Sequence, residues 1–257
     1  MYDSRRSCCG FNVARNCFGG VALLVGVPLL VIVHMKTVVL TAFFVERRAD
    51  SRLVAEILLE WLFCILVEAC LFLLLVADPG FIGEPTELSC RCANCKMEVE
   101  DFDHHCGVLG ACIGRGNMCY FILFLLFASL LCLLGGLENV VYIVLFAAAH
   151  KKRNANSSWT SFSAWRTALT DGADVIHVAC LVLLSFVAVY GGAVCIFLCL
   201  RYTYLGYRGQ SSVRRRRRES LRGSLALVFA NVLNPQFSHK YTHPPIYAAE
   251  EMAKNTV

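Results

Sequence analysis

The chain has 257 residues, of which 57% are hydrophobic and only 17% are charged, and its formal net charge is +5 at pH 7. Its mean hydropathy of +0.58 is far more apolar than a soluble globule of this length needs. Such a composition argues against a soluble enzyme, and the sequence contains no evident nucleotide-binding loop, internal repeat or nucleic-acid module. We therefore expect an all-α polytopic membrane protein with no nucleic-acid partner.

Four apolar runs are long enough to cross a hydrocarbon core of roughly 30 Å, which takes about 20 helical residues. They are residues 19–45, 53–77, 118–149 and 175–200, and each is bounded by charged residues or by Gly and Pro. The first run is too long for a signal peptide and lacks a small-residue cleavage site before a soluble domain. We expect all four runs to be transmembrane helices.

The lysines and arginines of the connecting segments predict the orientation of these helices. Segments 1–18, 78–117 and 201–257 hold 3, 3 and 10 of them, which makes 16, whereas 46–52 and 150–174 hold 3 and 4, which makes 7. The second group also contains none of the 15 cysteines, as expected if the free thiols lie on the reducing side or within the spans. The prediction is that both termini and the 78–117 loop are cytosolic and that the 150–174 loop is lumenal.

The 78–117 loop carries a set of metal-ligating side chains. Cys92, Cys95, His105 and Cys112 have the spacing C-x2-C-x9-H-x6-C, and zinc takes about four nitrogen and sulfur ligands in a tetrahedron. A polar loop this small cannot bury a core, so metal binding would be its means of folding. We expect one structural Zn2+ on these four ligands; the alternative is a set of exposed cysteines without a metal.

Three reactive side chains bracket the ligand His105. A thiol with a pKa of about 8.5 is only a few per cent ionised at pH 7, so a nucleophilic cysteine needs a base beside it. His104 can act as that base for Cys106, and Asp103 can orient its imidazole. In the alternative assignment Cys106 is itself a metal ligand, either as a fifth one or in place of Cys92.

The residues around this cluster resemble a known family. The run Asp-His-His-Cys at 103–106 is followed six residues later by Cys112, then by Ile-Gly-Arg-Gly-Asn ending at Asn117, with Phe121 four residues further on. An Asp-Pro-Gly run at 78–80 follows the second apolar run. Together with four spans and a cysteine-rich loop between the second and third, this pattern is similar to that of the DHHC protein S-acyltransferases, or palmitoyltransferases.

The resemblance implies a two-step acyl transfer. Cys106 would take a long acyl chain from palmitoyl-CoA as a thioester and pass it to accessible cysteines of cytosolic or membrane proteins, with His104 as the base and Asp103 as its orienter. Cys92, Cys95, His105 and Cys112 would match the second of the family's two zinc sites. It further implies a protein of the endoplasmic reticulum or Golgi rather than the plasma membrane, with its active site on the cytosolic face of the bilayer.

The sequence also departs from the family pattern. The first zinc site would need a histidine and a cysteine where Arg91 and Glu98 stand, so it is expected to be lost. Gly107-Val108 replace the usual Pro-Trp, and Ser211 to Arg214 replaces Thr-Thr-x-Glu. These departures keep two alternatives open: a catalytically weak or inactive membrane adaptor and, more distantly, an ion or metal transporter.

Acidic residues lie on one stripe of the second span. Glu56, Glu60 and Glu68 are spaced i, i+4 and i+12, and acids inside a membrane are costly unless they have partners. His34 and Lys36 in the first span are the partners we expect; the alternative is that the acids are protonated and neutral. Cohesion of the helix bundle is the preferred interpretation, and a proton or ion pathway is the alternative.

Smaller features complete the sequence. Gly135, Gly136, Gly191 and Gly192 predict either an acyl-chain cavity or close helix packing. The arginine run 214–218 predicts binding to an anionic membrane surface. Cys8 and Cys9 are possible acylation sites, and Asn156-Ser157-Ser158 is a glycosylation sequon.

Overall fold

The computed structural model describes residues 6–8, 11–13, 18–46, 51–153, 172–208 and 229. Some features of the sequence lie outside these residues: Cys9, the sequon 156–158, the segment 211–214, the arginine run 214–218 and the tail beyond it. The cysteine-rich loop 78–117 is described throughout.

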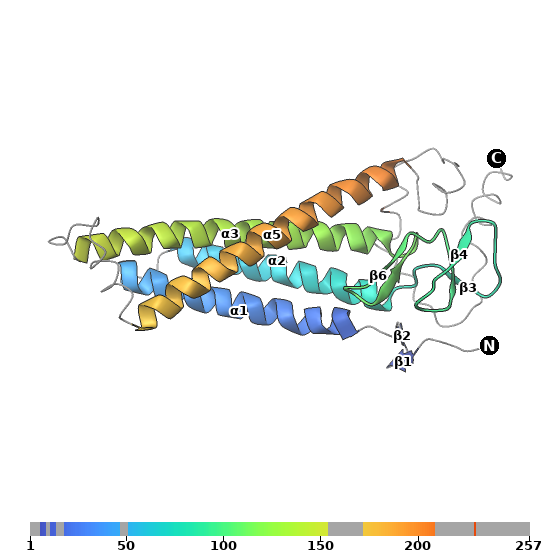
Figure 1. Ribbon diagram of the computed structural model, residues 1–257, viewed down its shortest axis with the longest axis horizontal. Helices are drawn as coiled ribbons and strands as arrows, with labels where there is room; N and C mark the ends of the chain where they lie inside the picture. The colour runs from blue at the N-terminus through green and yellow to red at the C-terminus, as the bar shows by residue number, and fades with distance from the viewer. Residues whose placement is uncertain are drawn as a thin grey trace. The chain divides into compact units, whose positions relative to one another are not determined.

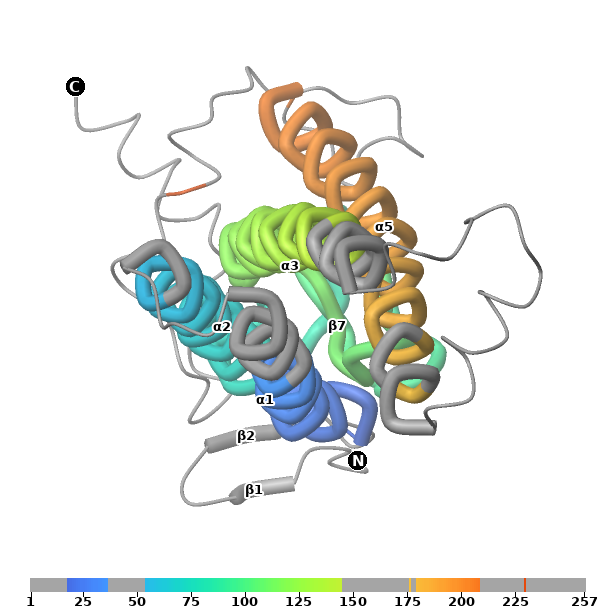
Figure 2. Tube along the Cα trace, turned by 90° about the vertical axis from the view of Figure 1, so that its left-hand side faces the viewer, coloured from blue at the N-terminus to red at the C-terminus, as the bar shows by residue number. Residues whose placement is uncertain are grey.

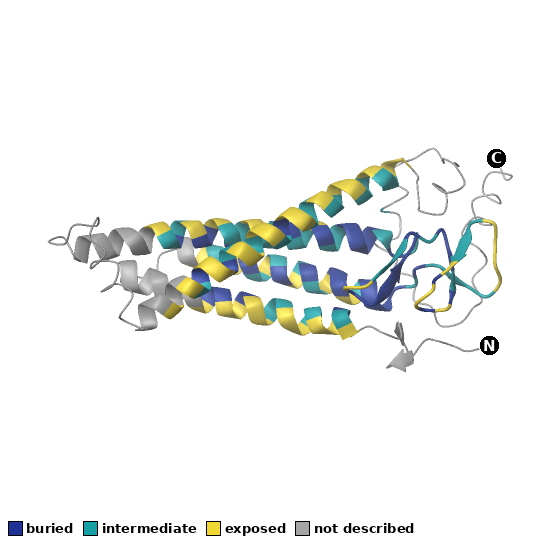
Figure 3. Cartoon of the chain, viewed as in Figure 1, coloured by how far each residue is buried: buried dark blue, intermediate teal, exposed yellow. Residues whose placement is uncertain are grey.

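Four long helices, α1 (Phe18–Glu46), α2 (Ser51–Val76), α3 (Met118–Arg153) and α5 (Gly172–Tyr207), dominate the described part of the chain (Figure 1). Each is long and apolar enough to cross a membrane, over Phe18–Lys36, Val54–Val76, Met118–Val144 and Ala179–Tyr207. Exposed residues, many of them apolar, run along all four helices, as expected for surfaces that face lipid (Figure 3). The predicted class, a polytopic four-helix membrane protein with a cysteine-rich loop between its second and third helices, is confirmed.

The helix ends differ slightly from the predicted spans. The largest difference is at α5, which continues to Tyr207 instead of ending at 200. Because residues 201–207 are helical, Tyr202 takes a position in the site described below.

Short antiparallel strands make up the rest of the described structure. Strands β1 (Arg6–Cys8) and β2 (Phe11–Val13) pair with each other. In the cysteine-rich loop, β3 (Phe81–Ile82), β4 (Ser89–Arg91) and β5 (Glu98–Glu100) form a sheet in the order β3-β5-β4. Strands β6 (His104–Cys106) and β7 (Ala111–Ile113) form a separate hairpin.

The chain divides into two compact units, and all four long helices contribute to both. The first unit comprises Met1–Val25, Val67–Leu125 and Leu198–Val257, and the second comprises Gly26–Leu66 and Leu126–Phe197. The core of the cysteine-rich loop, in the first unit, consists of buried residues with two phenylalanines packed against them: Cys92, Cys95, Met97, Val99, Cys112, Phe81 and Phe102. The three cysteines predicted as ligands therefore belong to a small apolar core.

In the second unit α1, α2 and α3 lie side by side (Figure 2). Buried Val31, Met35 and Cys64 form a core there, with Trp61 and Leu131 packed against it. Helices α3 and α5 approach each other closely, because a Cβ atom on Gly192 would lie 3.1 Å from the Cβ atom of Cys132. At this position the structure favours close helix packing as the role of the glycine.

Candidate functional site

A tight turn in the cysteine-rich loop brings Cys92 and Cys95 together. The N–H group of Lys96 donates to the carbonyl of Cys92 (2.8 Å), and the N–H group of Cys92 donates to the carbonyl of Met97 (2.9 Å). Lys96 takes a left-handed conformation with φ of 58°, which reverses the chain within a few residues. The Cys95 N–H group also points at the Cys92 sulfur, 3.4 Å away, so the turn positions the Cys92 sulfur through backbone geometry.

The other two ligand candidates lie opposite each other on the β6–β7 hairpin. The register pairs His105 with Cys112, and residues directly opposite in an antiparallel pair point to the same face. A spacing of x6 between these ligands is therefore what a short hairpin needs to deliver both side chains to one point.

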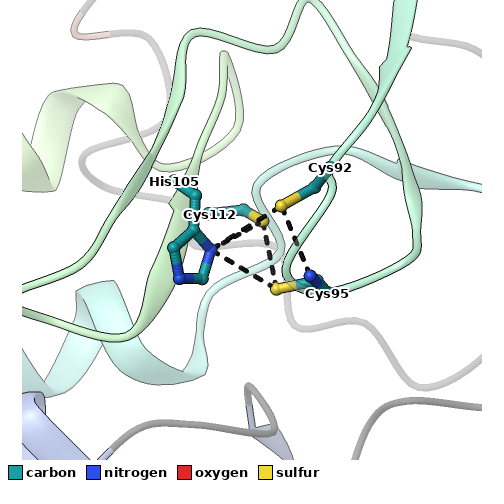
Figure 4. Close-up of side chains that lie close together, drawn as sticks. All are labelled: Cys92, Cys95, His105 and Cys112. Atoms are coloured by element: carbon teal, nitrogen blue, oxygen red, sulfur yellow. Dashed lines mark hydrogen bonds between the residues drawn. The ribbon is translucent and has the colours of Figure 1, made fainter.

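The four donor atoms converge at tetrahedral separations. His105 Nδ1 lies 3.7, 3.5 and 3.7 Å from the sulfur atoms of Cys92, Cys95 and Cys112, and the Cys95 and Cys112 sulfurs are 3.4 Å apart (Figure 4). Zinc–sulfur bonds of about 2.3 Å and zinc–nitrogen bonds of about 2.0 Å in a tetrahedron give donor separations of about 3.5–3.8 Å. All four donors lie within 4.8 Å of one another, so this cluster fits a metal ion of zinc's size.

Two positions that would hold ligands of the family's first zinc site carry opposite charges in this chain. Arg91 and Glu98 are register partners on β4 and β5, and the Glu98 carboxylate accepts a hydrogen bond from the Ser89 hydroxyl (3.1 Å). A cross-strand pair of opposite charge stabilises such a ladder modestly. Within the loop, every residue of which is described, His105 and the three cysteines Cys92, Cys95 and Cys112 form the one cluster with metal-ligating geometry.

Asp103, His104 and Cys106 form a second constellation. Side chains alternate along a strand, so His104 and Cys106 share one face of β6 while His105 takes the other. The Asp103 carboxylate oxygen Oδ2 lies 2.8 Å from His104 Nδ1, and Asp103 is buried. Because Nδ1 is engaged by Asp103, the other ring nitrogen of His104 remains for the hydrogen bond with Cys106.

The electrostatics of this constellation favour charge separation. Burial by itself would raise the pKa of the Cys106 thiol, but the hydrogen bond from His104 and the backbone N–H groups of Leu109 and Val108 outweigh burial and lower the pKa. Burial by itself would lower the pKa of the His104 imidazole, but hydrogen bonds and charge interactions with Asp103 and Cys106 raise it to about 9. The two pKa shifts have opposite signs and the same origin, because each partner favours the charged form of the other.

Two aromatic rings enclose the His104 imidazole. The ring of Tyr202, from α5, stacks on it with centroids 5.4 Å apart and an interplanar angle of 21°. Phe121, from α3, meets it edge-on at 5.4 Å and 65°. The Tyr202 hydroxyl also lies 3.4 Å from His104 Nδ1. Phe121 belongs to the sequence pattern around the Asp-His-His-Cys run, whereas Tyr202 could not be predicted, since nothing local links a tyrosine in the fourth helix to a histidine 98 residues earlier.

The Asp-Pro-Gly and Ile-Gly-Arg-Gly-Asn segments hold the hairpin in place. The Asp78 carboxylate accepts hydrogen bonds from the N–H groups of Gly80 (2.9 Å) and Phe81 (2.8 Å). A Cβ atom at Gly114 would lie 2.3 Å from the Pro79 carbonyl oxygen, and one at Gly116 would lie 2.2 Å from the Asp78 carbonyl oxygen. Only glycine at 114 and 116 permits these close backbone contacts between the two segments.

Asn117 ties the ligand strand β7 to the start of α3. Its side-chain oxygen accepts a hydrogen bond from the Gly114 N–H group, and its side-chain nitrogen donates to the Cys112 carbonyl, both at 3.0 Å. The side chain is 1% exposed. Asn117 therefore fixes the backbone of a ligand candidate without belonging to the cluster itself.

The start of α1 supports the turn that follows Cys106. The N–H group of Gly20 donates to the Leu109 carbonyl (3.1 Å). A Cβ atom on Gly19 would lie 1.9 Å from the Val108 carbonyl oxygen. The glycine pair that opens the first span thus allows its backbone to touch the turn beside the candidate nucleophile.

The fold and the site together define a multi-pass membrane protein with a metal-type Cys/His cluster next to a carboxylate–imidazole–thiol constellation. The family model described as "DHHC palmitoyltransferase" matches residues 87–219, which is more than half of the chain. The chain belongs to the DHHC palmitoyltransferase family.

Relatives with similar sequences carry acyltransferase names. "Probable protein S-acyltransferase 5" of Arabidopsis thaliana is 32% identical over 128 residues, 49% of this chain and 24% of that protein. "Palmitoyltransferase ZDHHC22" of Mus musculus is 33% identical over 134 residues, 51% of this chain and 49% of that protein. "Palmitoyltransferase ZDHHC9" of Homo sapiens is 46% identical over 55 residues, 21% of this chain and 15% of that protein. The chain therefore matches half or less of the length of each relative.

Proposed function

We propose that this protein is a protein-cysteine S-acyltransferase that moves a palmitoyl group from palmitoyl-CoA, by way of a Cys106 thioester, to cysteines of substrate proteins. The observation that carries the proposal is the chain of contacts from Asp103 through His104 to Cys106, with the 2.8 Å Asp103–His104 contact at its base. Family membership and the names of the relatives support the same reaction.

The first half-reaction uses the charge separation at the site. The lowered pKa of Cys106 and the raised pKa of His104 favour a thiolate beside an imidazolium as the reactive form of the pair. The thiolate attacks the thioester carbonyl of palmitoyl-CoA, the bond from that carbonyl to the CoA sulfur breaks, and the imidazolium gives its proton to the departing CoA thiolate. The products are palmitoyl-Cys106 and free CoA.

The second half-reaction reverses these roles. Neutral His104 takes the proton of a substrate cysteine, and the resulting thiolate attacks the palmitoyl-Cys106 carbonyl. The bond from the carbonyl to the Cys106 sulfur then breaks, which restores the thiolate–imidazolium pair. The N–H groups of Val108 and Leu109, which already bind the Cys106 sulfur, stabilise it as the leaving group. Asp103 stabilises the imidazolium and holds its orientation in both steps.

A zinc ion held by Cys92, Cys95, His105 and Cys112 would fix the hairpin on which His104 and Cys106 stand. Its contribution is structural, because four protein ligands leave no open coordination position. The neighbouring His105 thereby links folding of the loop to the position of the reactive pair.

The location of the site suits an acyl chain that partitions into hydrocarbon at about 0.8 kcal/mol per methylene. The apolar helix α3 begins at Met118, shortly after the hairpin. The acyl chain can therefore lie beside apolar residues at the depth of the bilayer while the CoA head stays in water. The Lys/Arg distribution supports a cytosolic position for the site and both termini, and the membrane we expect is that of the endoplasmic reticulum or Golgi. The partners are palmitoyl-CoA, the bilayer, and cytosolic or membrane proteins with accessible cysteines.

The test is acyl labelling of the purified protein with a clickable palmitoyl-CoA analogue. Wild type should acquire label that hydroxylamine removes, and Cys106→Ser should acquire none while its zinc content stays unchanged. Cys90→Ser is the matched control, since Cys90 is a partly exposed thiol of the same loop that belongs to neither constellation. Wild-type labelling no greater than that of Cys106→Ser would refute the enzyme and leave the adaptor alternative.

A further inference from the structure

A second cluster of ligand-type side chains lies in the second unit, among the membrane-spanning helices. It consists of His34 from α1, Glu60 from α2 and Glu138 from α3, whose donor atoms all lie within 4.8 Å of one another. The three residues are only 6%, 3% and 6% exposed. The expected partnership of His34 with an acid of the second span is confirmed for Glu60, whereas Lys36 is exposed.

The contacts within the cluster single out one nitrogen of His34. Its Nε2 atom lies 2.9 Å from the side-chain oxygen of Asn139, which is 1% exposed. With an ion bound, a hydrogen bond from Nε2 to that oxygen would hold the ring proton on Nε2 and free the lone pair of Nδ1, the atom that faces Glu60 (2.6 Å) and Glu138 (4.0 Å). A neutral imidazole oriented by an oxygen acceptor on its far nitrogen is the usual state of a metal-bound histidine.

The amide group of Asn139 also has a polar atom left over. Its Nδ2 atom is buried and has no hydrogen-bond partner among the residues that the structure describes, although buried amide nitrogens normally donate hydrogen bonds. A buried donor that the described residues do not satisfy therefore lies beside His34.

We propose that His34, Glu60 and Glu138 form a second metal site, within the membrane-spanning helices, that takes a divalent first-row transition-metal ion such as Zn2+. One imidazole and two carboxylates are ligands that zinc accepts, and three protein ligands with one open position are a common zinc arrangement. A dication balances the two carboxylates while His34 stays neutral, so the assembled site carries no net charge inside the hydrocarbon.

The spacing of the donors is compatible with such an ion after a small adjustment. Ligands about 2.0 Å from a tetrahedral metal lie about 3.3 Å from one another, which falls between the two observed separations from Nδ1, 2.6 and 4.0 Å. To bind the ion, the two glutamate side chains would have to move so that these two distances become similar. Since each ligand comes from a different helix, the ion would tie α1, α2 and α3 together.

The experiment measures metal content in full-length protein in lipid nanodiscs, equilibrated with Zn2+ and freed of excess ion. Wild type should hold about two equivalents per chain, one on the cysteine-rich loop and one on this cluster. Glu138→Gln and Glu60→Gln should each hold one. Glu68→Gln is the matched control, because it removes a carboxylate from α2 outside the cluster, and it should hold two.

Co2+ in place of Zn2+ separates the two sites by their ligands. The loop site has three thiolates, so its cobalt shows sulfur-to-metal charge transfer, whereas cobalt on His34 and two carboxylates does not. Glu138→Gln should keep the charge-transfer band and lose the second cobalt, which also shows that the loop is intact.

Two results would overturn the proposal. One is a single equivalent in wild type, which would show that the cluster is held by shared protons instead. The other is two equivalents in both glutamine variants. Should neither variant fold, the wild-type cobalt count and spectrum decide by themselves. None of these readouts depends on acyl transfer, so a failed acyltransferase and a failed metal site are distinguishable.

Discussion

Replacing Asn117 by alanine should weaken zinc binding by the loop although Asn117 is not a ligand. The substitution removes two buried hydrogen bonds of 3.0 Å and leaves the Gly114 N–H group and the Cys112 carbonyl without their side-chain partner. A buried polar group that loses its partner costs about 1–3 kcal/mol, so the folded loop loses about 2–6 kcal/mol before relaxation. Because Cys112 is a ligand candidate, part of this cost falls on the metal site.

The expected loss of zinc affinity can be taken from other proteins in which a group that orients a metal ligand is removed. Loss of such a group reduces metal affinity by about 10- to 100-fold, which is about 1.4–2.8 kcal/mol and is only part of the cost of the two lost hydrogen bonds. We therefore expect the zinc dissociation constant of the loop to rise by about 10- to 100-fold, accompanied by slower labelling of Cys106.

The assay is competition for zinc with a chromophoric chelator, on protein in nanodiscs, with Glu138→Gln as the common background so that only the loop site is titrated. Asn94→Ala is the control, since it makes the same chemical change at an exposed position between Cys92 and Cys95. An affinity of Asn117→Ala equal to that of Asn94→Ala would refute the reasoning, because the buried side chain would then contribute nothing to the ligand strand.

Two further substitutions test the surroundings of the reactive pair. Gly19→Ala should lower the acyl-labelling rate at least tenfold, because the added Cβ atom would collide with the Val108 carbonyl. Gly26→Ala is the control and should match wild type, because no atom lies within 4 Å of its added Cβ. Equal labelling rates for the two variants would argue against the contact between Gly19 and Val108. Tyr202→Ala should slow labelling by about 2- to 10-fold through loss of a stacking interaction of about 0.5–1.5 kcal/mol, and Tyr202→Phe should retain most of the rate because it keeps the ring on His104. A Tyr202→Phe rate as low as that of the alanine variant would assign the effect to the hydroxyl instead.

Much of the fold was predictable from local sequence. The four membrane-spanning helices follow from apolar runs of sufficient length, because the bilayer imposes its thickness on any helix that crosses it. The convergence of Cys92, Cys95, His105 and Cys112 was predictable for a similar reason, since a two-residue knuckle and a short hairpin have few ways to present their ligands. The end of the fourth helix was not, because the helix continues from 201 to Tyr207 beyond its apolar run.

The tertiary structure alone decided which distant side chains meet. Strand alternation already separates His104 and Cys106 from His105, but the ring of Tyr202 reaches His104 only because of the position of α5 in the first unit. Glu56, Glu60 and Glu68 share one stripe in the sequence, yet Glu60 joins His34 and Glu138, while Glu56 accepts a hydrogen bond from Tyr142 (3.1 Å). An apolar run determines that a helix crosses the membrane, but the rotation of that helix about its axis depends on packing against its neighbours. The sequence by itself thus determined the spans and the loop that carries the ligand candidates. Packing decided which partners each polar side chain contacts.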